Sequence, residues 1–385
     1  MLLSALLLVL SPVLSAYAAP AAAHDSHDHE HTTAQRLPAA WYQPRGHPVH
    51  QLFSRATTDG VSYPAVGTPE WSQGWPQGVP DNTKLPSAWV NALNAAVAAG
   101  KIPNIPQSSN QPNQNPVYPQ GLNPNSPEIC SATYKCRNPE DIWDAPNGTY
   151  ATSFDDGPQP ASATLLDFMS ANNVTGTHFM IGTNILNNPD TFAKAFNLNH
   201  DIAVHTWTHP YMTTLSNLDV LGQLGYTMQL IHNSTGGRVP RFWRPPYGDS
   251  DNRVRAIAAE VFGLQTVVWN QDTNDWAIST NGNTVDKVVS TLTGYLTGPK
   301  TPGLIILEHE IVDGTVQAWI NAFPMIKANG WNMISLAKIV DGRSYQNAAG
   351  SSSDDVEPGD ILVGDENNST DTSDDGDDSS SNATS

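Results

Sequence analysis

The sequence predicts an α/β fold in which parallel strands, joined by helices, form a barrel-like sheet. From about Thr149, short apolar segments alternate with helical stretches, and this alternation is typical of parallel βαβ units. Roughly six or seven such units fit this region, enough for a barrel-like sheet. Clusters of polar residues directly follow predicted strands, which is where α/β barrels gather their catalytic groups.

The expected strands and helices follow from the apolar runs and from the Gly, Pro and Asn residues that bound them. We expect strands at residues 149–154, 176–182, 201–205, 264–270, 303–308 and 332–336. We expect helices at residues 163–173, 188–199, 254–263, 285–296 and 315–330.

Composition divides the 385-residue chain into four parts. Residues 1–19 are typical of a signal peptide, because an apolar run ends in small residues, although no Lys or Arg precedes it. Residues 20–128 form a polar, Pro-rich extension, with a short helix near residues 87–99. The folded domain is expected at residues 129–345, and a disordered Ser/Asp-rich tail at residues 346–385.

The formal net charge of −19 comes mostly from the tail, since residues 351–385 carry eleven acids and no Lys or Arg. No basic patch stands out elsewhere, so nucleic acid is not expected as a partner. A His-rich tract near the N-terminus could bind metal, but a disordered segment is the simpler interpretation. The tract contains His24, His27, His29 and His31.

Several features favour an exported protein. No stretch after the predicted signal peptide is long and apolar enough to span a membrane. Six Asn-x-Ser/Thr sequons are candidate N-glycosylation sites, namely Asn147, Asn173, Asn233, Asn367, Asn368 and Asn382. Cys130 and Cys136 are the only cysteines, and in an oxidising compartment we expect them to form a disulfide.

Two of the polar clusters suggest a metal centre. His205 and His209, in the segment HTWTH, have the spacing at which two imidazoles can bind one ion. The segment SFDDGP offers Asp155 or Asp156 as a third ligand, and three protein ligands leave one position for water, as in hydrolytic zinc sites. Taken separately, a structural histidine and an ordinary Asp-Gly turn explain the same residues.

Three further polar clusters complete the pattern. Arg244, in the segment RPPYGD, can hold a carboxylate through two parallel hydrogen bonds. The segment DTNDW contains Asp275, and the segment LEH places His309 at the end of a very apolar strand. Taken one at a time, these clusters are also compatible with a Pro turn, a solvated Asn/Asp turn and a core histidine.

In this order, the five segments resemble the five motifs of the carbohydrate esterase family 4 polysaccharide deacetylases, the NodB-homology domain. The family pattern TFDDGP, H[ST]xxH, RxP[YF], DxxDW and LxH is matched by SFDDGP, HTWTH, RPPY, DTNDW and LEH. Ser153 in place of the usual Thr is the one departure. The resemblance covers about residues 150–336 and implies a distorted (β/α) barrel with parallel strands.

The resemblance also implies a metal centre with a neighbouring base. Asp156, His205 and His209 would bind a divalent ion, expected to be Zn²⁺ with Co²⁺ as an alternative. Asp155 would act as the general base that takes a proton from the attacking water. Arg244 would keep Asp155 ionised and aimed.

The remaining motif residues would serve the leaving group and the acetyl group. His309 would be the general acid, and Asp275 would fix its tautomer and raise its pKa. The backbone N–H of Tyr247 would help to hold the oxyanion. Trp276 and Leu307 would line the acetyl pocket.

Within the family, fungal chitin deacetylases are the most similar, given the signal peptide, the Pro-rich extension and the acidic tail. The resemblance implies release of acetate from chitin or a related polysaccharide by a protein that is secreted or held in the cell wall. No hydrophobic segment follows the tail, so attachment to a membrane is expected only through a glycosylphosphatidylinositol (GPI) signal removed after Ser385.

Three alternatives stay open. The same chemistry could act on acetylxylan or peptidoglycan, because the motifs describe the reacting centre and not the sugar-binding loops. An inactive carbohydrate-binding wall protein could keep the same fold. An Fe(II) oxygenase could use two histidines and a carboxylate, but its carboxylate generally follows the first histidine closely, where this chain has Thr206, Trp207 and Thr208.

Overall fold

A computed structural model describes residues 57–111, 114–278 and 282–363. All of them fall within one compact unit, Ser54–Ser385. The expected signal peptide, the His-rich tract and the sequons at Asn367, Asn368 and Asn382 lie outside the described residues.

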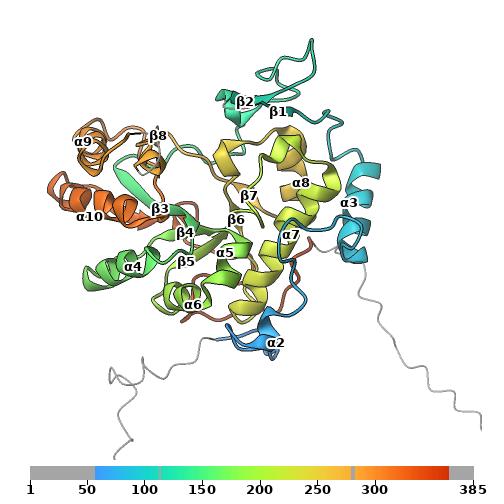
Figure 1. The fold of residues 1–385 in the computed structure, drawn as a ribbon, viewed down its shortest axis with the longest axis horizontal. Coiled ribbons are helices and arrows are strands. Elements are labelled where there is room, and N and C mark those ends of the chain that lie inside the picture. The colour runs from blue at the N-terminus through green and yellow to red at the C-terminus, as the bar shows by residue number, and fades with distance from the viewer. Residues whose placement is uncertain (1–56, 112–113, 279–281, 364–385) are drawn as a thin grey trace, which may run out of the picture. The chain divides into compact units, whose positions relative to one another are not determined.

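Six parallel strands form the central sheet, in the order β10-β3-β4-β5-β6-β7 (Figure 1). They are β3 (Thr149–Gly157), β4 (Thr177–Met180), β5 (Asp201–Val204), β6 (Phe242–Trp243), β7 (Gln265–Thr266) and β10 (Asn332–Ser335). A separate antiparallel pair, β1 (Ser109–Gln111) and β2 (Gln114–Val117), precedes them in the chain. Except at Asp156, β3 is buried along its whole length, as expected for a parallel strand covered on both faces.

A pair of short parallel strands, β8 (Gln271–Asp272) and β9 (Ile306–Leu307), carries the sheet round towards β3. Single parallel bridges join Tyr150 to Leu304 and Asp155 to His309. The backbone N–H of Asp155 donates to the carbonyl of Glu308 at 2.9 Å. Because this closure is short and irregular, the sheet is a distorted barrel, and the predicted fold class is confirmed.

Helices surround the sheet on its outside (Figure 1). They are α2 (Pro69–Ser72), α3 (Ser87–Ala98), α4 (Ser162–Ala171), α5 (Gly182–Asn187), α6 (Pro189–Asn197), α7 (Asn217–Ser234), α8 (Asn252–Phe262), α9 (Val285–Leu296) and α10 (Asp313–Ala328). Side-chain caps begin several of them: Ser216 accepts from the N–H of Asp219 at 3.2 Å, and Asp251 accepts from that of Val254 at 2.9 Å. None of the helices in the described ranges is long and apolar enough to cross a membrane.

The expected helices and strands recur with shifts of a few residues, but strands β1, β2 and β6 had no counterpart in the sequence analysis, and besides the short α2 neither did two helices. One is α5, which directly follows β4. The other is α7, the longest helix of the described chain, which contains Gly222 and Gly225. Glycine lowers helix propensity by about 1 kcal/mol relative to alanine, so the pattern did not indicate a helix there.

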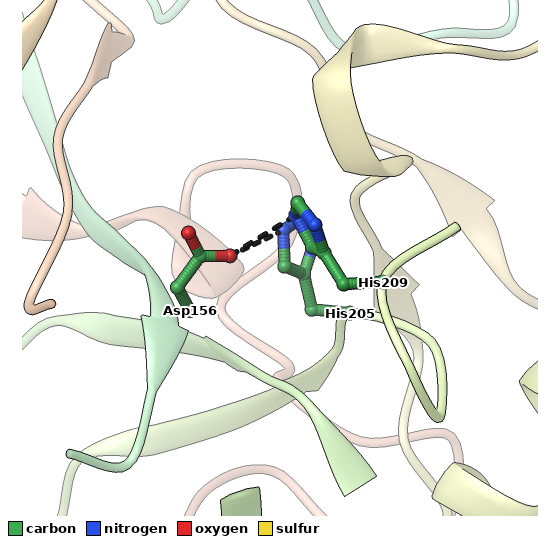
Figure 2. A group of neighbouring side chains, drawn as sticks. All are labelled: Asp156, His205 and His209. Atoms are coloured by element: carbon green, nitrogen blue, oxygen red, sulfur yellow. Dashed lines mark ion pairs between the residues drawn. The ribbon is translucent and has the colours of Figure 1, made fainter. Parts of the chain in front are cut away.

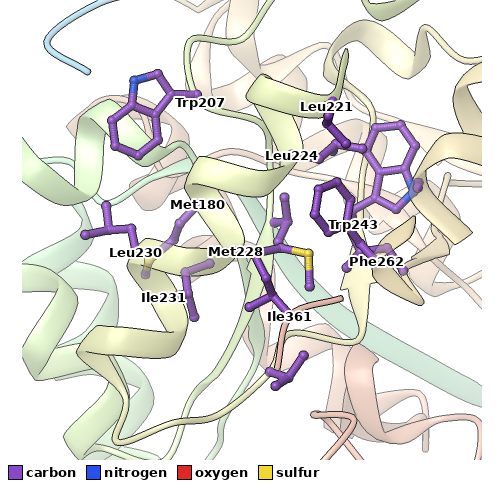
Figure 3. Close-up of a cluster of buried hydrophobic side chains, with 14 of the residues drawn as sticks. Met180, Trp207, Leu221, Leu224, Met228, Leu230, Ile231, Trp243, Phe262 and Ile361 are labelled. Atoms are coloured by element: carbon purple, nitrogen blue, oxygen red, sulfur yellow. The ribbon is translucent and has the colours of Figure 1, made fainter. Parts of the chain in front are cut away.

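The N-terminal extension and the start of the expected tail both pack into the core. Trp71 and Trp89 from the extension belong to the same buried cluster as residues of α7 and α8. Ile361, 1% exposed, enters this cluster from the C-terminal side (Figure 3). The structure therefore differs from the expected boundaries, since folded chain begins before residue 129 and continues past residue 345 to residue 363. The sequence did not indicate these contacts, because the apolar residues that make them are few and lie in polar or Pro-rich stretches.

Candidate metal centre and active site

The polar clusters meet at the carboxyl ends of the parallel strands. Asp155 and Asp156 lie near the carboxyl end of β3, and His205 directly follows β5. Arg244 directly follows β6, and His309 comes two residues after β9. Since the carboxyl ends of parallel strands share one end of a barrel, residues far apart in the sequence are brought together there.

Asp156, His205 and His209 form a compact cluster that could hold a metal ion (Figure 2). The Oδ1 atom of Asp156 lies 3.2 Å from Nε2 of His205 and 3.1 Å from Nε2 of His209. One donor atom from each of the three residues lies within 4.8 Å of the others. Asp156, rather than Asp155, therefore completes the trio with the two histidines.

The donor atoms suit a cation. Nδ1 of His205 lies 2.7 Å from the backbone carbonyl of Arg244, which can only accept, so Nδ1 carries the proton. In the neutral ring, Nε2 then presents a lone pair to Asp156 Oδ1, a buried oxygen that has no hydrogen-bond donor within the described chain. Two such acceptors repel each other unless a cation or a proton lies between them. Aspartate oxygen and imidazole nitrogen are ligands that Zn²⁺ prefers.

The environment keeps Asp156 ionised. Burial alone would raise the pKa of Asp156, but hydrogen bonds from the imidazoles of His205 and His209, with a proton in the place where a cation would lie, hold that pKa well below its ordinary value. Asp156 and His209 both have a left-handed backbone, with φ of 68° and 61°. Such conformations are uncommon for residues other than glycine and are frequent at functional sites.

On one side of the cluster, Asp155 is held by a buried arginine. Nη1 of Arg244 donates to Oδ1 of Asp155 at 2.6 Å, and Nη2 donates to the Ser153 hydroxyl at 3.1 Å. The guanidinium carbon lies 4.2 Å from the ring centroid of Phe179. The other carboxylate oxygen of Asp155 lies 3.9 Å from Nε2 of His205. The carboxylate of Asp155 is therefore held in place and faces the cluster.

On the other side, Asp275 holds His309. Oδ1 of Asp275 lies 2.6 Å from Nδ1 of His309, and its Oδ2 accepts from the backbone N–H of the same residue at 2.8 Å. Burial opposes protonation of His309, but the charge of Asp275 prevails and raises the pKa of the imidazole to about 10. Nε2 of His309 lies 4.0 Å from Oδ2 of Asp156. A protonated imidazole thus faces the cluster from this side.

The other predicted site residues lie near the same groups, in the chain or in space. Tyr247 is 53% exposed, its ring stacks on that of Tyr211, and its edge contact with His209 has a centroid separation of 4.6 Å. Trp276 is 44% exposed, whereas Leu307 is buried. Their placement fits the expected roles, which stay predictions.

The predicted disulfide between Cys130 and Cys136 is confirmed. Of the sequons within the described residues, Asn147 and Asn173 are exposed. Asn233 is partly buried, and its side-chain oxygen accepts from Gln229 Nε2 at 2.8 Å.

Sequence reasoning missed a buried polar group behind the site. Oε1 of Glu310 lies 2.8 Å from Nδ1 of His178, whose Nε2 lies 2.9 Å from Nδ1 of His200. Glu310 is so close to Gly157 that a Cβ there would lie 1.9 Å from its Oε1. This contact braces the turn that carries Asp156 against the residue that follows His309. A histidine within the apolar segment GTHFMIG was the available signal.

Fold and site together describe a barrel protein in which a candidate metal centre lies between a carboxylate and an imidazole. The family model described as polysaccharide deacetylase matches residues 144–267. Chitin deacetylase 3 of Cryptococcus neoformans var. neoformans is 40% identical over 334 residues, covering 84% of this chain and 78% of that protein. The chain belongs to the polysaccharide deacetylase family.

Two further relatives are similar over shorter stretches. A chitin deacetylase of Amylomyces rouxii is 37% identical over 182 residues, which is 46% of this chain and 41% of that protein. The solved structure of the chitin deacetylase from Colletotrichum lindemuthianum is 23% identical with a TM-score of 0.49, and the match covers 54% of this chain and 95% of that one.

Proposed function

We propose that the protein hydrolyses N-acetyl groups of N-acetylglucosamine residues in chitin, giving chitosan and acetate. The observation that carries this proposal is the arrangement of one His₂Asp cluster between an Arg-held carboxylate and an Asp-held imidazole. The 40% identity to a chitin deacetylase over most of the chain supports the choice of substrate.

Asp156, His205 and His209 would hold the metal, for which we propose Zn²⁺, with Co²⁺ as the alternative. When bound, such an ion lowers the pKa of a coordinated water and polarises the acetamide carbonyl. The three residues supply one carboxylate and two imidazoles, and three protein ligands leave a coordination position for water and substrate.

Asp155 would accept the proton of the attacking water. A general base must be ionised and correctly aimed, and the 2.6 Å ion pair with the buried Arg244 favours both. The backbone N–H of Tyr247 would donate to the oxyanion of the tetrahedral intermediate, since this residue stands at the rim beside His209.

His309 would donate a proton to the leaving amine. An amine leaves poorly unless it is protonated, and the raised pKa of His309, about 10, keeps its proton available at neutral pH. Asp275 holds Nδ1, so Nε2 is the atom that faces the reaction. The buried Leu307 and the exposed Trp276 would line the pocket for the acetyl methyl group.

Acetate release tests this function. The purified chain, treated with a chelator and reloaded with Zn²⁺, is expected to release acetate from chitopentaose and little from acetylxylan. Release from acetylxylan alone would reassign the substrate, and dependence on Fe(II) and O₂ would indicate an oxygenase. A protein that holds zinc but releases no acetate from either polymer, or from peptidoglycan, would be the inactive wall-binding alternative.

We also propose that the chain is exported and acts at the cell wall. The predicted signal peptide and the exposed positions of Asn147 and Asn173 support export. Attachment through a removed GPI signal is a further proposal. Release of the protein from cells by a phosphatidylinositol-specific phospholipase would support it, whereas a precursor that stops at Ser385 would contradict it.

A further inference from the structure

Trp207 lies between the two histidines of the metal cluster in the sequence, and it is completely buried (Figure 3). On one side its ring fits against Gly182, where a Cβ would lie 2.1 Å from the indole. On another side lies Trp75 of the N-terminal extension, at a centroid separation of 6.1 Å. The indole N–H of Trp207 donates to the backbone carbonyl of Pro76 at 3.2 Å. The extension therefore contacts the loop that carries both imidazoles.

This loop needs outside support. Thr206 and His209 have positive φ angles of 64° and 61°, conformations that such residues adopt only when their surroundings impose them. Gln223 of α7 supplies part of the support, since its side-chain oxygen accepts from the backbone N–H groups of Trp207 and Thr208, both at 2.9 Å. Trp75 and Pro76 supply further support, because they contact the side chain of Trp207 in the same loop.

The extension packs closely against α7 at two glycines of that helix. A Cβ at Gly225 would lie 2.6 Å from the ring of Trp89, and one at Gly222 would lie 3.1 Å from Leu85. Trp71 adds a hydrogen bond at the far end of the helix, from its indole N–H to the Ser234 hydroxyl at 2.7 Å. The segment is thus fixed to the helix that also carries Gln223.

We propose that residues 69–100 are a positioning element of the metal centre, which fixes His205 and His209 through the contact of Trp75 and Pro76 with Trp207. The inference rests on the proposed metal site. It gives the folded part of the N-terminal extension a role in positioning the metal ligands. Residues that orient metal ligands without touching the metal typically change affinity by 10- to 100-fold when replaced.

Metal affinity tests this proposal without any substrate. Zn²⁺ binding to the full chain is measured by competition with a chromogenic chelator for Trp75→Ala and for Trp207→Phe, which keeps a ring but loses the N–H. Both variants are expected to bind Zn²⁺ roughly tenfold more weakly. Trp75→Phe, which restores an aromatic contact, is expected to recover most of the affinity.

Ile361→Ala is the control, because Ile361 is buried in the same core cluster but lies outside residues 69–100. It should lower the unfolding temperature and leave Zn²⁺ affinity at the wild-type value. The proposal is overturned if Trp75→Ala and Trp207→Phe keep wild-type affinity, or if Ile361→Ala weakens binding equally. A wild-type chain that binds no Zn²⁺ would instead contradict the proposed function.

Discussion

Arg244 illustrates at the residue scale how one side chain serves both stability and the proposed chemistry. It is completely buried, and a buried charge is tolerated only when partners satisfy it. Asp155, Ser153 and the carbonyl of Val268 are its partners, and the ring of Phe179 lies against its guanidinium. Removing either member of such a buried pair leaves the other charge unpaired, which costs about 3–5 kcal/mol.

Asp155→Asn is expected to lower acetate release roughly 10²–10⁴-fold, because the variant cannot take the proton of the attacking water. Bound metal, measured by elemental analysis, should stay at the wild-type level, since Asp156 and the two histidines are intact. Asp167→Asn, a change in an exposed ion pair, is the control and should keep full activity. Wild-type deacetylation by Asp155→Asn would rule out Asp155 as the base.

Asp275→Asn is expected to change the pH profile of kcat. The charge of Asp275 overcomes burial and raises the pKa of His309 to about 10. His309 must be protonated to act as the acid, so activity should fall as the pH rises through this pKa. Without the charge of Asp275 the pKa of His309 drops, so the alkaline limb of the kcat profile should move to lower pH. The loss of activity should be smallest on the acid side, where His309 is still protonated.

Asp286→Asn, at the exposed start of α9, should leave the same limb in place. An unchanged alkaline limb in Asp275→Asn would show that a group other than His309 supplies the proton.

The motif residues could be predicted because the five segments carry their own signature, and the structure brings them together at one end of the barrel. The choice between Asp155 and Asp156 could not be made from spacing, since it depends on the left-handed turn at Asp156. The pairing of Glu310 with His178 was beyond prediction, because the two residues meet across β3 from segments far apart in the chain. Nothing in either segment alone pairs them.

At the scale of elements, the packing of the N-terminal extension against α7 depends on two glycines of that helix, Gly222 and Gly225. Gly225→Ala would place a Cβ 2.6 Å from Trp89 and 3.0 Å from Phe262. We expect this overpacking to lower the free energy of unfolding by about 1–3 kcal/mol. Denaturant unfolding measures it.

Gly294→Ala in α9 is the matched control, because a Cβ at that position meets no atom within 4 Å. There the helix propensity of alanine should raise stability by about 1 kcal/mol. If the two substitutions changed the free energy of unfolding equally, Trp89 would not pack against Gly225. The glycines of α7 also explain why the sequence analysis missed this helix. They are needed for contacts with Leu85 and Trp89, which are far from α7 in the sequence.

At the scale of the whole described molecule, the folded chain is longer than the five motifs suggest. Ile361 is 1% exposed within the cluster around α7 and α8 (Figure 3). Ile361→Ala is expected to lower the free energy of unfolding by about 2–5 kcal/mol, because it leaves a cavity in this core.

Val363→Ala is the control, since its side chain is 51% exposed and surface changes usually stay within about 0.5 kcal/mol. If thermal or denaturant unfolding placed both variants at wild-type stability, Ile361 would not belong to the core. Composition could not locate this boundary, because the short apolar run Ile361–Val363 lies within a stretch that is otherwise rich in Ser and Asp.

Arg238 joins the two flanks of the described chain. Its guanidinium donates to the carbonyls of Thr57, Gly350 and Asp354, at 2.8, 3.1 and 2.7 Å. Arg238 precedes β6, so this junction lies at the amino ends of the strands, whereas the reacting groups lie at the carboxyl ends. A fusion partner or surface linker joined at either flank would therefore meet the barrel at its base and leave the mouth free to engage a polymer.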